Sequence, residues 1–594
     1  MLFIDYVVVA VYLIAVMVIG LMVQRKASAG IDSYFLGNRN LPWWILGASG
    51  MSSNVDVSGT MINTAFIYAL GTLGFFIEIR GGVTLIMAFL MIFMGKWNRR
   101  AQVMTLAEWM HLRFGTSREG DLARIISAVG ALIMTVAMIT YFAIGSGKFI
   151  GEFLGIPEYM ATLIMIVLAS TYTIASGLYG VVWTDVVQGG LIFGMIIYIC
   201  WLAIDLVNLP EVFSVSVPLG GGNFQTISTT LADWTRLVPP WELELPGAYS
   251  IYNLFGIAIM FYLFKVTLEG SSGAGNYMIQ RYFAAKNDRE AGLLSLFWIL
   301  LLAFRWPLIA AFALLGVHYG LTHQVIADPE LVLPTVLNTY IPGGMKGLIV
   351  AGLMAAAMST FDSTVNAGAA YWVKDLYQTF LNPKATERQL MRHSYWASAV
   401  IIILGTVASF GISNINEIWG WITMGIGAGM FIPQVLRWYW WRFNGYGFAW
   451  GTVAGMVAAV MTKVFAGTIP EYWSFSIACG GSLAGCILGT YLTEPTDPKV
   501  LLKFYKITRP FGFWGPVRSG VPAATIAKIN TENRRDLLAT CFAVPWQVVL
   551  FLLFMMTVLR RWDNVSILFV TLLALSVGLY LSWFRHLSTE VRVD

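Results

Sequence analysis

The sequence is short of charge. Asp, Glu, Lys and Arg make up 12% of the 594 residues, whereas 58% are apolar and the mean hydropathy is +0.70. A soluble domain carries about 25% charged residues, so most of this chain must lie in a lipid bilayer. The net charge of +5 is small for the length, and we expect no nucleic-acid partner.

Reactive and metal-binding side chains are scarce as well. The four cysteines lie in or beside apolar stretches, the five histidines are scattered, and neither set has the spacing of a disulfide framework or a metal site. No Walker motif or dinucleotide-binding glycine motif is present. No His/Asp or Cys/His constellation falls within the apolar runs. We therefore expect a protein that is not an enzyme, which disfavours a membrane-embedded acyltransferase.

Long apolar runs fill the rest of the chain. A spanning helix needs about 20 apolar residues, and this rule predicts about fifteen transmembrane helices in an all-α polytopic protein. The predicted spans are residues 3–23, 44–70, 72–96, 123–153, 157–176, 182–207, 250–279, 291–318, 344–374, 390–411, 414–436, 447–467, 471–492, 541–559 and 564–584.

The basic residues indicate the topology. The first five residues lack the basic region of a signal peptide, and Arg25 and Lys26 follow the first apolar run. Basic and acidic loops then alternate, with residues 208–249 and 320–342 acidic, and Arg560 and Arg561 as the discordant pair. By the positive-inside rule, we expect a multi-pass protein of the plasma or bacterial inner membrane, with its N-terminus outside and its C-terminus cytoplasmic.

Two runs of Gly, Ser and Asn interrupt apolar segments, at residues 47–59 and 269–276. Interrupted segments at corresponding places in two halves are typical of transporters with inverted repeats, although small residues also allow close helix packing. The predicted organisation is an extra helix and loop (1–43), repeat 1 (44–207), repeat 2 (250–436), additional helices (447–492), a basic cytoplasmic loop (493–540) and C-terminal helices with a tail (541–594).

A polar stripe within the ninth span predicts an ion site. Ala356, Ser359, Thr360 and Ser363 share one helical face, at positions i, i+3, i+4 and i+7. Several oxygens with little bulk suit a small hard cation. If the first interrupted helix opens near Asp56, the carbonyls of Ser52 and Val55 come within reach of the Ser359 and Thr360 hydroxyls. We therefore predict a sodium site there.

Charged residues inside the spans are costly and indicate cavities or partners. They are Asp56, Glu78, Arg80, Asp185, Lys265, Glu269, Arg305, Asp362 and Glu417. Lys265 and Glu269 have the spacing of an i, i+4 ion pair, and Arg80 can snorkel from a helix end. Arg305 needs a partner, either Glu78 or an anionic solute. Asp185 is either an ion ligand or a hydrogen-bonded structural residue at a helix start.

Several segments resemble the sodium:solute symporter family, which includes carriers of proline, pantothenate, sialic acid and sugars. They occur in family order within residues 1–440. The segments are SYFLGNRNLPWW (33–44), TLAEWMHLRFG (105–115), SGLYGVVWTDVVQ (176–188), IQRYFAAK (279–286), AAAMSTFDS (355–363) and KDLY (374–377).

The resemblance implies a five-plus-five inverted-repeat core of the LeuT type, with broken first and sixth core helices. Its sodium site carries over to the carbonyls of Ser52 and Val55, together with Ala356, Ser359 and Thr360. A second sodium site of some members corresponds to Asp185, Ser359 and Ser363. The gating tyrosine before the Gln-Arg motif corresponds to Tyr277.

The solute is left open by the same resemblance. Glu78 matches a glutamate of the sugar carriers and Arg305 falls near their lysine, but Gly59 and Gly420 stand where those carriers have glutamines. Asp56 to Gly59 resembles a proline-carrier segment only with a two-residue shift. The residues that we expect to contact the solute are Asp56, Ser58, Glu78, Glu269, Asn276, Arg305 and Trp421, with Trp419 a further candidate by position.

The predicted function is sodium-coupled symport of a small organic solute by alternating access, with sodium as the coupling ion. The alternatives are a solute-sensing membrane module with the same fold and a proton-coupled symporter. We expect a monomer or a weak oligomer.

Overall fold

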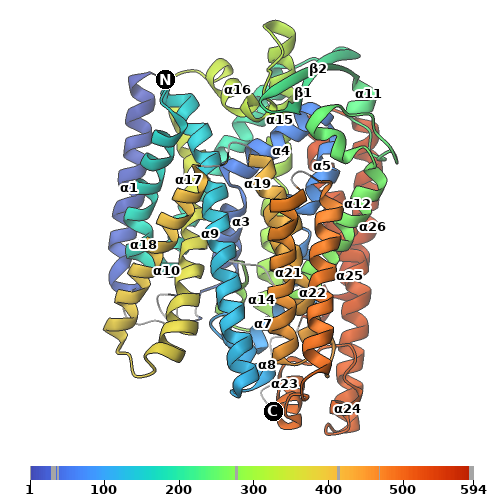
Figure 1. Cartoon of the computed structure of the whole chain (residues 1–594). Helices are drawn as coiled ribbons and strands as arrows, with labels where there is room; N and C mark the ends of the chain where they lie inside the picture. Colours follow the sequence, from blue (N-terminus) through green and yellow to red (C-terminus); the bar gives the residue numbers. More distant parts are fainter. Residues whose placement is uncertain are drawn as a thin grey trace.

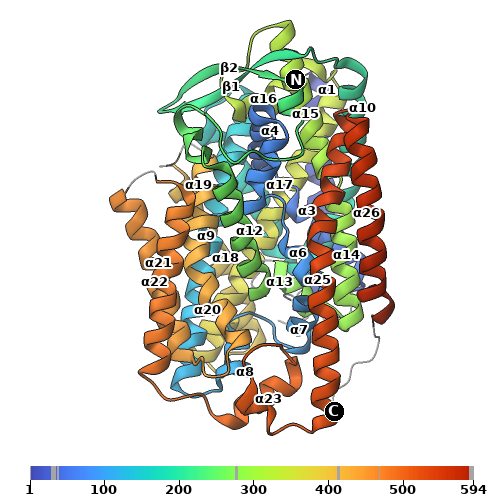
Figure 2. The same ribbon diagram turned by 90° about the vertical axis from the view of Figure 1, so that its right-hand side faces the viewer.

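The structure is a computed structural model that describes residues 2–27, 35, 39, 41–273, 278–410, 412, 415–466 and 469–587. The side chains of residues 16–17, 19–27, 154, 171–180 and 466 are not described. Long helices run side by side between two ends of the molecule (Figures 1 and 2). Within the described residues, nine helices are long and apolar enough to cross a membrane, and three shorter apolar helices accompany them.

Most of the long helices overlap the predicted spans, but the helix predicted at 541–559 begins at Ala523, inside the predicted cytoplasmic loop 493–540, and the spans 157–176 and 182–207 fall in one helix. The long helices are α1 (Phe3–Ala27), α9 (Arg118–Leu154), α10 (Glu158–Leu206), α12 (Phe255–Ser272), α14 (Asp288–Leu302), α15 (Arg305–Thr322), α17 (Met345–Ala370), α18 (Glu387–Ser409), α21 (Gly445–Ala466), α22 (Glu471–Tyr491), α25 (Ala523–Val558) and α26 (Trp562–Ser582).

Shorter elements link or extend these helices. They are α3 (Trp43–Asn54), α4 (Val57–Leu70), α5 (Thr72–Ile77), η2 (Glu78–Arg80), α6 (Ile86–Phe89), η3 (Leu90–Met94), α7 (Gly95–Arg100), α8 (Glu108–Phe114), α11 (Leu231–Trp234), η4 (Gly247–Tyr252), α13 (Met278–Ala284), η5 (Pro329–Leu331), α16 (Val332–Tyr340), η6 (Tyr371–Leu381), α19 (Ile415–Trp421), η7 (Ile422–Ile426), α20 (Gly427–Tyr439), α23 (Pro498–Thr508), α24 (Gly515–Arg518) and η8 (Phe584–His586).

Both predicted helix interruptions are present. Helix α3 ends at Asn54, Val55 leaves helical geometry with φ −98° and ψ 64°, and α4 starts after Asp56. Helix α12 ends at Ser272, where Gly273 adopts a left-handed conformation with φ +64°. Since a residue with a Cβ disfavours that conformation, the glycine permits the chain to leave the helix at this point.

A further interruption falls within the predicted span 72–96. Helix α5 gives way to the 3-10 turn η2, and regular α-helix resumes only at α6. Thr84 has a positive φ of +54° in this interval, which is uncommon for a residue other than glycine. At this opening the Arg80 carbonyl accepts a hydrogen bond from Lys265 Nζ at 2.6 Å, and the Gly82 carbonyl accepts one from Arg305 Nη1 at 3.5 Å. The predicted span 291–318 is likewise divided, because α14 ends at Leu302 and α15 begins at Arg305.

Helix α10 contains two predicted spans, 157–176 and 182–207. Its first turns lie near the end of α9, where the Thr162 hydroxyl donates to the Ala143 carbonyl at 3.1 Å. Its last turn leads to a β-hairpin, in which the Ser216 hydroxyl donates to the Ile326 carbonyl at 2.5 Å. Lys148 of α9 contacts Asp328 nearby, at 3.4 Å. The start of α10 and the hairpin that follows it therefore both lie near the C-terminal half of α9.

The hairpin consists of β1 (Val212–Gly220) and β2 (Asn223–Thr230), paired antiparallel with Val215 opposite Ile227. It lies at the end of the bundle that holds the N-terminus (Figure 1). The sequence predicted only an acidic loop at residues 208–249, which contain this hairpin. The fold remains predominantly helical, and the hairpin lies outside the spans.

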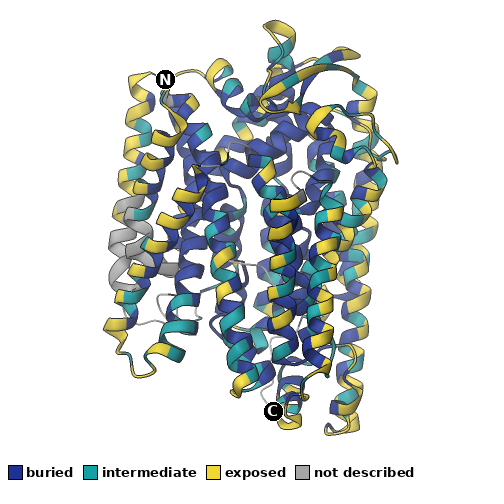
Figure 3. Ribbon diagram, viewed as in Figure 1, coloured by how far each residue is buried: buried dark blue, intermediate teal, exposed yellow. Residues whose placement is uncertain are grey.

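Helix α17 lies at the centre of the bundle. In its most apolar stretch, 94% of the residues are buried, compared with 17% for α26. The burial colours of Figure 3 show the same contrast between the interior and the outer helices. The helix with the predicted ion stripe is thus enclosed by protein, while α26 presents most of its apolar surface outward.

The N-terminal helix is tied to α17 by one carboxylate. Asp5 is fully buried, and its Oδ1 accepts hydrogen bonds from the backbone N–H groups of Gly344 and Gly347, each at 2.7 Å. These N–H groups lie at the start of α17, where helical hydrogen bonds are missing. Asp5 therefore caps α17 from a distant part of the chain.

We expect Asp5→Ala to destabilise the protein by about 1–2 kcal/mol, the usual effect of losing a helix cap, and to lower its thermal unfolding temperature in detergent. Asp5→Asn keeps an acceptor oxygen and should lose less. An unchanged unfolding temperature for Asp5→Ala would contradict this role.

Candidate functional site

The polar stripe of α17 faces the broken end of α3. The Thr360 hydroxyl donates to the Ser53 carbonyl at 2.8 Å and lies 3.2 Å from the Ala356 carbonyl. The Ser53 hydroxyl lies 3.1 Å from Ser359 Oγ and 2.9 Å from Ser363 Oγ. All of these groups are buried, so the two helices bring together neutral oxygens with little side-chain bulk.

The α3 carbonyl that faces α17 differs from the two that were predicted to bind sodium. The carbonyl nearest to Thr360 Oγ1 belongs to Ser53, whereas the Ser52 hydroxyl donates to the Asp185 carbonyl at 2.9 Å. Val55 is the C-cap residue that directly follows the end of α3 at Asn54. The predicted residues on α17 are therefore placed together, and α3 presents Ser53 between the two predicted carbonyl residues.

The residues of the second predicted ion site surround a guanidinium group. Arg281 of α13 is fully buried, and its Nη2 donates to Ser49 Oγ at 2.8 Å, Ser53 Oγ at 2.8 Å and Ser363 Oγ at 3.0 Å. The same nitrogen lies 3.5 Å from Asp185 Oδ2, and Ser49 donates to that oxygen at 2.5 Å. A fixed positive charge of the protein thus compensates Asp185.

A small polar cavity of about 50 Å³ lies beside the first helix break. Arg305 Nη2 lies 3.5 Å from Asp56 Oδ1, which identifies Asp56 as the ion-pair partner of Arg305, in place of the predicted Glu78. Glu78 instead binds Arg80 at 3.0 Å. The cavity is lined by Asp56, Asn63, Glu78, Tyr141, Arg305 and Trp419, among others.

Two groups in this cavity have unused hydrogen-bonding capacity. The side-chain amide of Asn63 is buried, and neither its oxygen nor its nitrogen has a hydrogen-bond partner among the described residues. The same holds for the Nε–H of Arg305. A buried polar group without a partner costs about 1–3 kcal/mol. These atoms are therefore candidates to bind a polar solute.

A second cavity, of about 180 Å³, adjoins the first and shares Asn54, Gly81, Thr84, Met138 and Trp419 with it. Its lining is largely apolar and also includes the Lys265–Glu269 pair. Lys265 Nζ lies 2.7 Å from Glu269 Oε2 and donates to the Arg80 carbonyl at 2.6 Å. The predicted i, i+4 pairing is confirmed.

The remaining predicted contact residues fall outside these cavities. The Ser58 hydroxyl donates to the Tyr141 carbonyl at 3.4 Å, so its side chain faces α9. Trp421 lines neither cavity, whereas Trp419 lines both. Asn276 and the predicted gate Tyr277 lie outside the described residues.

The prediction that Arg80 snorkels to a helix end is wrong. Arg80 is fully buried and forms ion pairs with Glu78 and Glu471, and it also donates to Asn416 and, at 3.1 Å, to Tyr252. Burial of a charge is tolerable when opposite charges and hydrogen bonds surround it. Arg80 thus connects η2 to α19 and α22 beside the cavity.

Several site residues were not identified from the sequence. Ser49, Ser53, Asn63, Tyr141 and Arg281 were assigned no role at the site, although Ser53 and Arg281 lie inside segments noted for other reasons. Their roles depend on contacts between helices far apart in the sequence.

Among the described residues, no group of three or more His, Cys, Asp or Glu side chains could hold a metal ion. The groups available to bind a cation are therefore the neutral hydroxyl and carbonyl oxygens of α3 and α17.

Helix breaks beside a buried oxygen cluster and a polar cavity define a secondary transporter with an inverted-repeat core. The family model for "Sodium:solute symporter family" matches residues 34–455, which is 422 of the 594 residues. The chain belongs to the sodium:solute symporter family. It is therefore a sodium-coupled symporter, in a family of transporters, and is a multi-pass membrane protein.

Relatives support this assignment. A sodium/glucose cotransporter of Vibrio parahaemolyticus is 26% identical over 79% of this chain and 86% of its own length. A sodium/glucose cotransporter 4 of Danio rerio is 26% identical over 77% of this chain and 71% of its own. A solved structure of a Na⁺-coupled sialic acid symporter has a TM-score of 0.64 at 21% identity and covers 84% of this chain and 99% of its own, which confirms the predicted fold class.

The space around Gly59 provides a test of the cavity. A Cβ at this position would lie 2.5 Å from Asp56 Oδ1, 2.6 Å from Arg305 Nη2 and 3.0 Å from Tyr141 Oη. We expect Gly59→Ala to push these groups apart and to reduce solute uptake about tenfold or more. Gly190→Ala, whose Cβ would contact nothing within 4 Å, is the matched control. Equal uptake by both variants would exclude this arrangement from solute binding.

Proposed function

We propose that the coupling sodium ion binds between the broken end of α3 and the polar stripe of α17. The donors are the Ser359 and Thr360 hydroxyls, the Ala356 carbonyl and the α3 carbonyls from Ser52 to Val55. The supporting observation is the 2.8 Å contact between Thr360 and the Ser53 carbonyl, because it joins the two helices whose separation alternating access changes. A sodium ion bound at this junction stabilises the contact between α3 and α17.

We further propose a single sodium ion. Arg281 already provides the positive charge next to Asp185, Ser363 and Ser53, and a second cation there would meet electrostatic repulsion. Solute uptake should therefore depend hyperbolically on sodium concentration, without a sigmoidal phase.

For the solute, we propose a neutral, hydroxyl-rich molecule of the sugar or polyol class. Both carboxylates that line the cavity are already paired, Asp56 with Arg305 and Glu78 with Arg80, so a charged solute would have to compete with these ion pairs. The Asn63 amide and the Arg305 Nε–H offer a donor and acceptor set that suits hydroxyl groups. Relatives named as sodium/glucose and sodium/mannose cotransporters agree with this class.

We also propose the finer organisation. The two inverted repeats are residues 44–207 and 250–436. They are flanked by residues 1–43, 447–492, 493–540 and 541–594. The transport unit is one chain, because both helix breaks and both cavities lie within it. The N-terminus lies outside and the C-terminus in the cytoplasm of a cell with a plasma or inner membrane. Solute crosses without covalent chemistry.

The function is tested by uptake into proteoliposomes with an inward sodium gradient. The panel contains neutral monosaccharides and polyols, amino acids and carboxylates. We expect sodium-driven uptake of at least one neutral hydroxylated solute. Uptake of charged solutes only would reject the proposed solute class. Uptake driven by a pH gradient without sodium would reject sodium coupling. Solute binding without any uptake would favour a solute sensor.

Removing the hydroxyls of Ser359 and Thr360 should weaken sodium binding. We expect Ser359→Ala with Thr360→Ala to raise the sodium concentration for half-maximal uptake at least about tenfold, since each lost polar contact costs about 1–3 kcal/mol. Thr360→Ser keeps the hydroxyl and should retain most of the affinity. Wild-type sodium dependence in the double variant would show that sodium binds elsewhere.

Asn63 allows solute binding to be separated from stability. Its amide has no hydrogen-bond partner in the part of the chain that the structure describes, so Asn63→Ala should weaken solute affinity about tenfold without lowering the unfolding temperature in the absence of solute. Ser58→Ala, in the same helix but directed at α9, should leave affinity unchanged. If Asn63→Ala keeps the solute affinity, the amide is not a solute ligand.

A further inference from the structure

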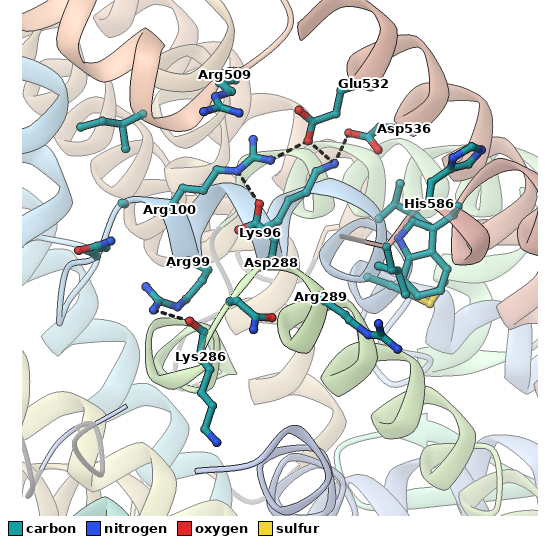
Figure 4. Close-up of a pocket in the computed structure, with 18 of the residues that line it drawn as sticks. Lys96, Arg99, Arg100, Lys286, Asp288, Arg289, Arg509, Glu532, Asp536 and His586 are labelled. Atoms are coloured by element: carbon teal, nitrogen blue, oxygen red, sulfur yellow. Dashed lines mark hydrogen bonds and ion pairs between the residues drawn. The ribbon is translucent and has the colours of Figure 1, made fainter. Parts of the chain in front are cut away.

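A large basic cavity lies outside the transport site, at the end of the bundle where α7 and α23 lie (Figures 1 and 2), and Figure 4 shows its lining. Its volume is about 650 Å³. One wall consists of η3, α7 and the segment after α13, and the other wall consists of α23, α25 and the end of α26 with η8. The second wall lies beyond residue 455, where the match to the family model ends.

The charge of this cavity is exceptional for the chain. Its lining contains nine lysine and arginine side chains against three carboxylates, an excess of six positive charges. The whole protein has a net charge of only +5, so the remainder of the chain carries a net charge of about −1 by difference. Positive charge is therefore concentrated at this one site, where it attracts anions.

The three carboxylates are bound to two of the cations. Lys96 contacts Glu532 at 2.8 Å and Asp536 at 2.6 Å, and Arg100 contacts Glu532 at 2.7 Å and Asp288 at 2.8 Å. Figure 4 shows Lys96 and Arg100 reaching from α7 toward the carboxylates of α25. The acidic groups thus hold the two walls together, and the other cations remain in excess over them.

Arg99 has unused hydrogen-bonding capacity at the cavity. Its Nη2 donates to the Lys286 carbonyl at 2.8 Å, while its Nε–H is buried without a hydrogen-bond partner among the described residues. Burial and the nearby Arg39 lower the pKa of the Arg99 guanidinium, and Asp288 opposes this shift. On the rim, the side chains of Arg289, Lys503 and Lys506 are exposed, so they are accessible to a ligand.

The cavity also has apolar surface. Met91, Ile92, Trp583 and Leu587 line part of it, and the neighbouring α26 exposes apolar side chains such as Val570 and Val577. Basic groups next to apolar surface at a membrane boundary suit the headgroup and the adjacent acyl region of an anionic phospholipid. A free phosphate compound would use the basic groups alone.

We propose that this cavity binds a phosphate-bearing anion, which links α7 of the transporter core to the C-terminal helices α23 and α25. The phosphate oxygens accept hydrogen bonds from Arg99 and contact the rim cations Arg289, Lys503 and Lys506. The source is either the headgroup of an anionic phospholipid or a soluble phosphate compound, and both carry the same recognised group.

The test uses the full-length protein in detergent and native mass spectrometry, with phosphatidylglycerol, phosphatidylcholine and pyrophosphate as probes. The test variant is Arg289→Glu with Lys503→Glu and Lys506→Glu. The matched control reverses three exposed basic residues that do not line this cavity, as Lys384→Glu with Arg388→Glu and Arg392→Glu. Size-exclusion profiles establish that the variants are folded, and the milder Gln substitutions replace the Glu ones if they are not.

We expect the wild type and the control to bind phosphatidylglycerol or pyrophosphate, and the rim variant to bind the same probe at least about tenfold more weakly. Preference for phosphatidylglycerol over phosphatidylcholine identifies a lipid source, and binding of pyrophosphate alone identifies a soluble one. Equal affinity in the rim variant and the wild type, or no preference for either phosphate anion over phosphatidylcholine, would overturn the proposal. These results do not depend on sodium or on the transported solute.

Discussion

Backbone groups that leave a helix inside a membrane must find new partners, and this constraint organises the core of the protein. Where α3 stops at Asn54, side chains of α17 and α13 meet the freed end, through Thr360 at the Ser53 carbonyl and Arg281 at the Ser49 and Ser53 hydroxyls. In a low-dielectric interior such contacts are strong and their loss is costly. The break is therefore stable only in this setting, and it gives the protein a polar junction at the centre of the bundle.

The junction separates two tasks that use the same helix. On the α3 side of the break, neutral oxygens of α3 and α17 could hold a small cation, and the charge of Asp185 is balanced by Arg281. On the α4 side, Asp56 pairs with Arg305, and Asn63 has unused hydrogen-bonding capacity. The proposed sodium site lies at the end of α3, covalently next to Asp56 of the proposed solute site. This proposal couples ion and solute binding over very few residues.

Much of this architecture could be predicted from the sequence, because its signals are local. The Gly, Ser and Asn run at residues 47–59 predicted the break at Val55, and the spacing of Ser359, Thr360 and Ser363 predicted a shared face. Long-range partners could not be predicted in the same way. Arg80 is buried because Glu471, nearly 400 residues later, neutralises it, and helical periodicity contains no information about that contact. The opening after η2 has a local signal, Gly81 and Gly82, which a count of apolar residues does not register.

The central claim, that sodium binds where α3 breaks against α17, is tested most directly by hydrogen–deuterium exchange. Peptides covering residues 51–62 include the break, and exchange is compared in sodium chloride and in potassium chloride at equal ionic strength. The account predicts slower exchange of this segment in sodium, and no such slowing in the variant with Ser359→Ala and Thr360→Ala. Identical exchange of residues 51–62 in the two salts would contradict it.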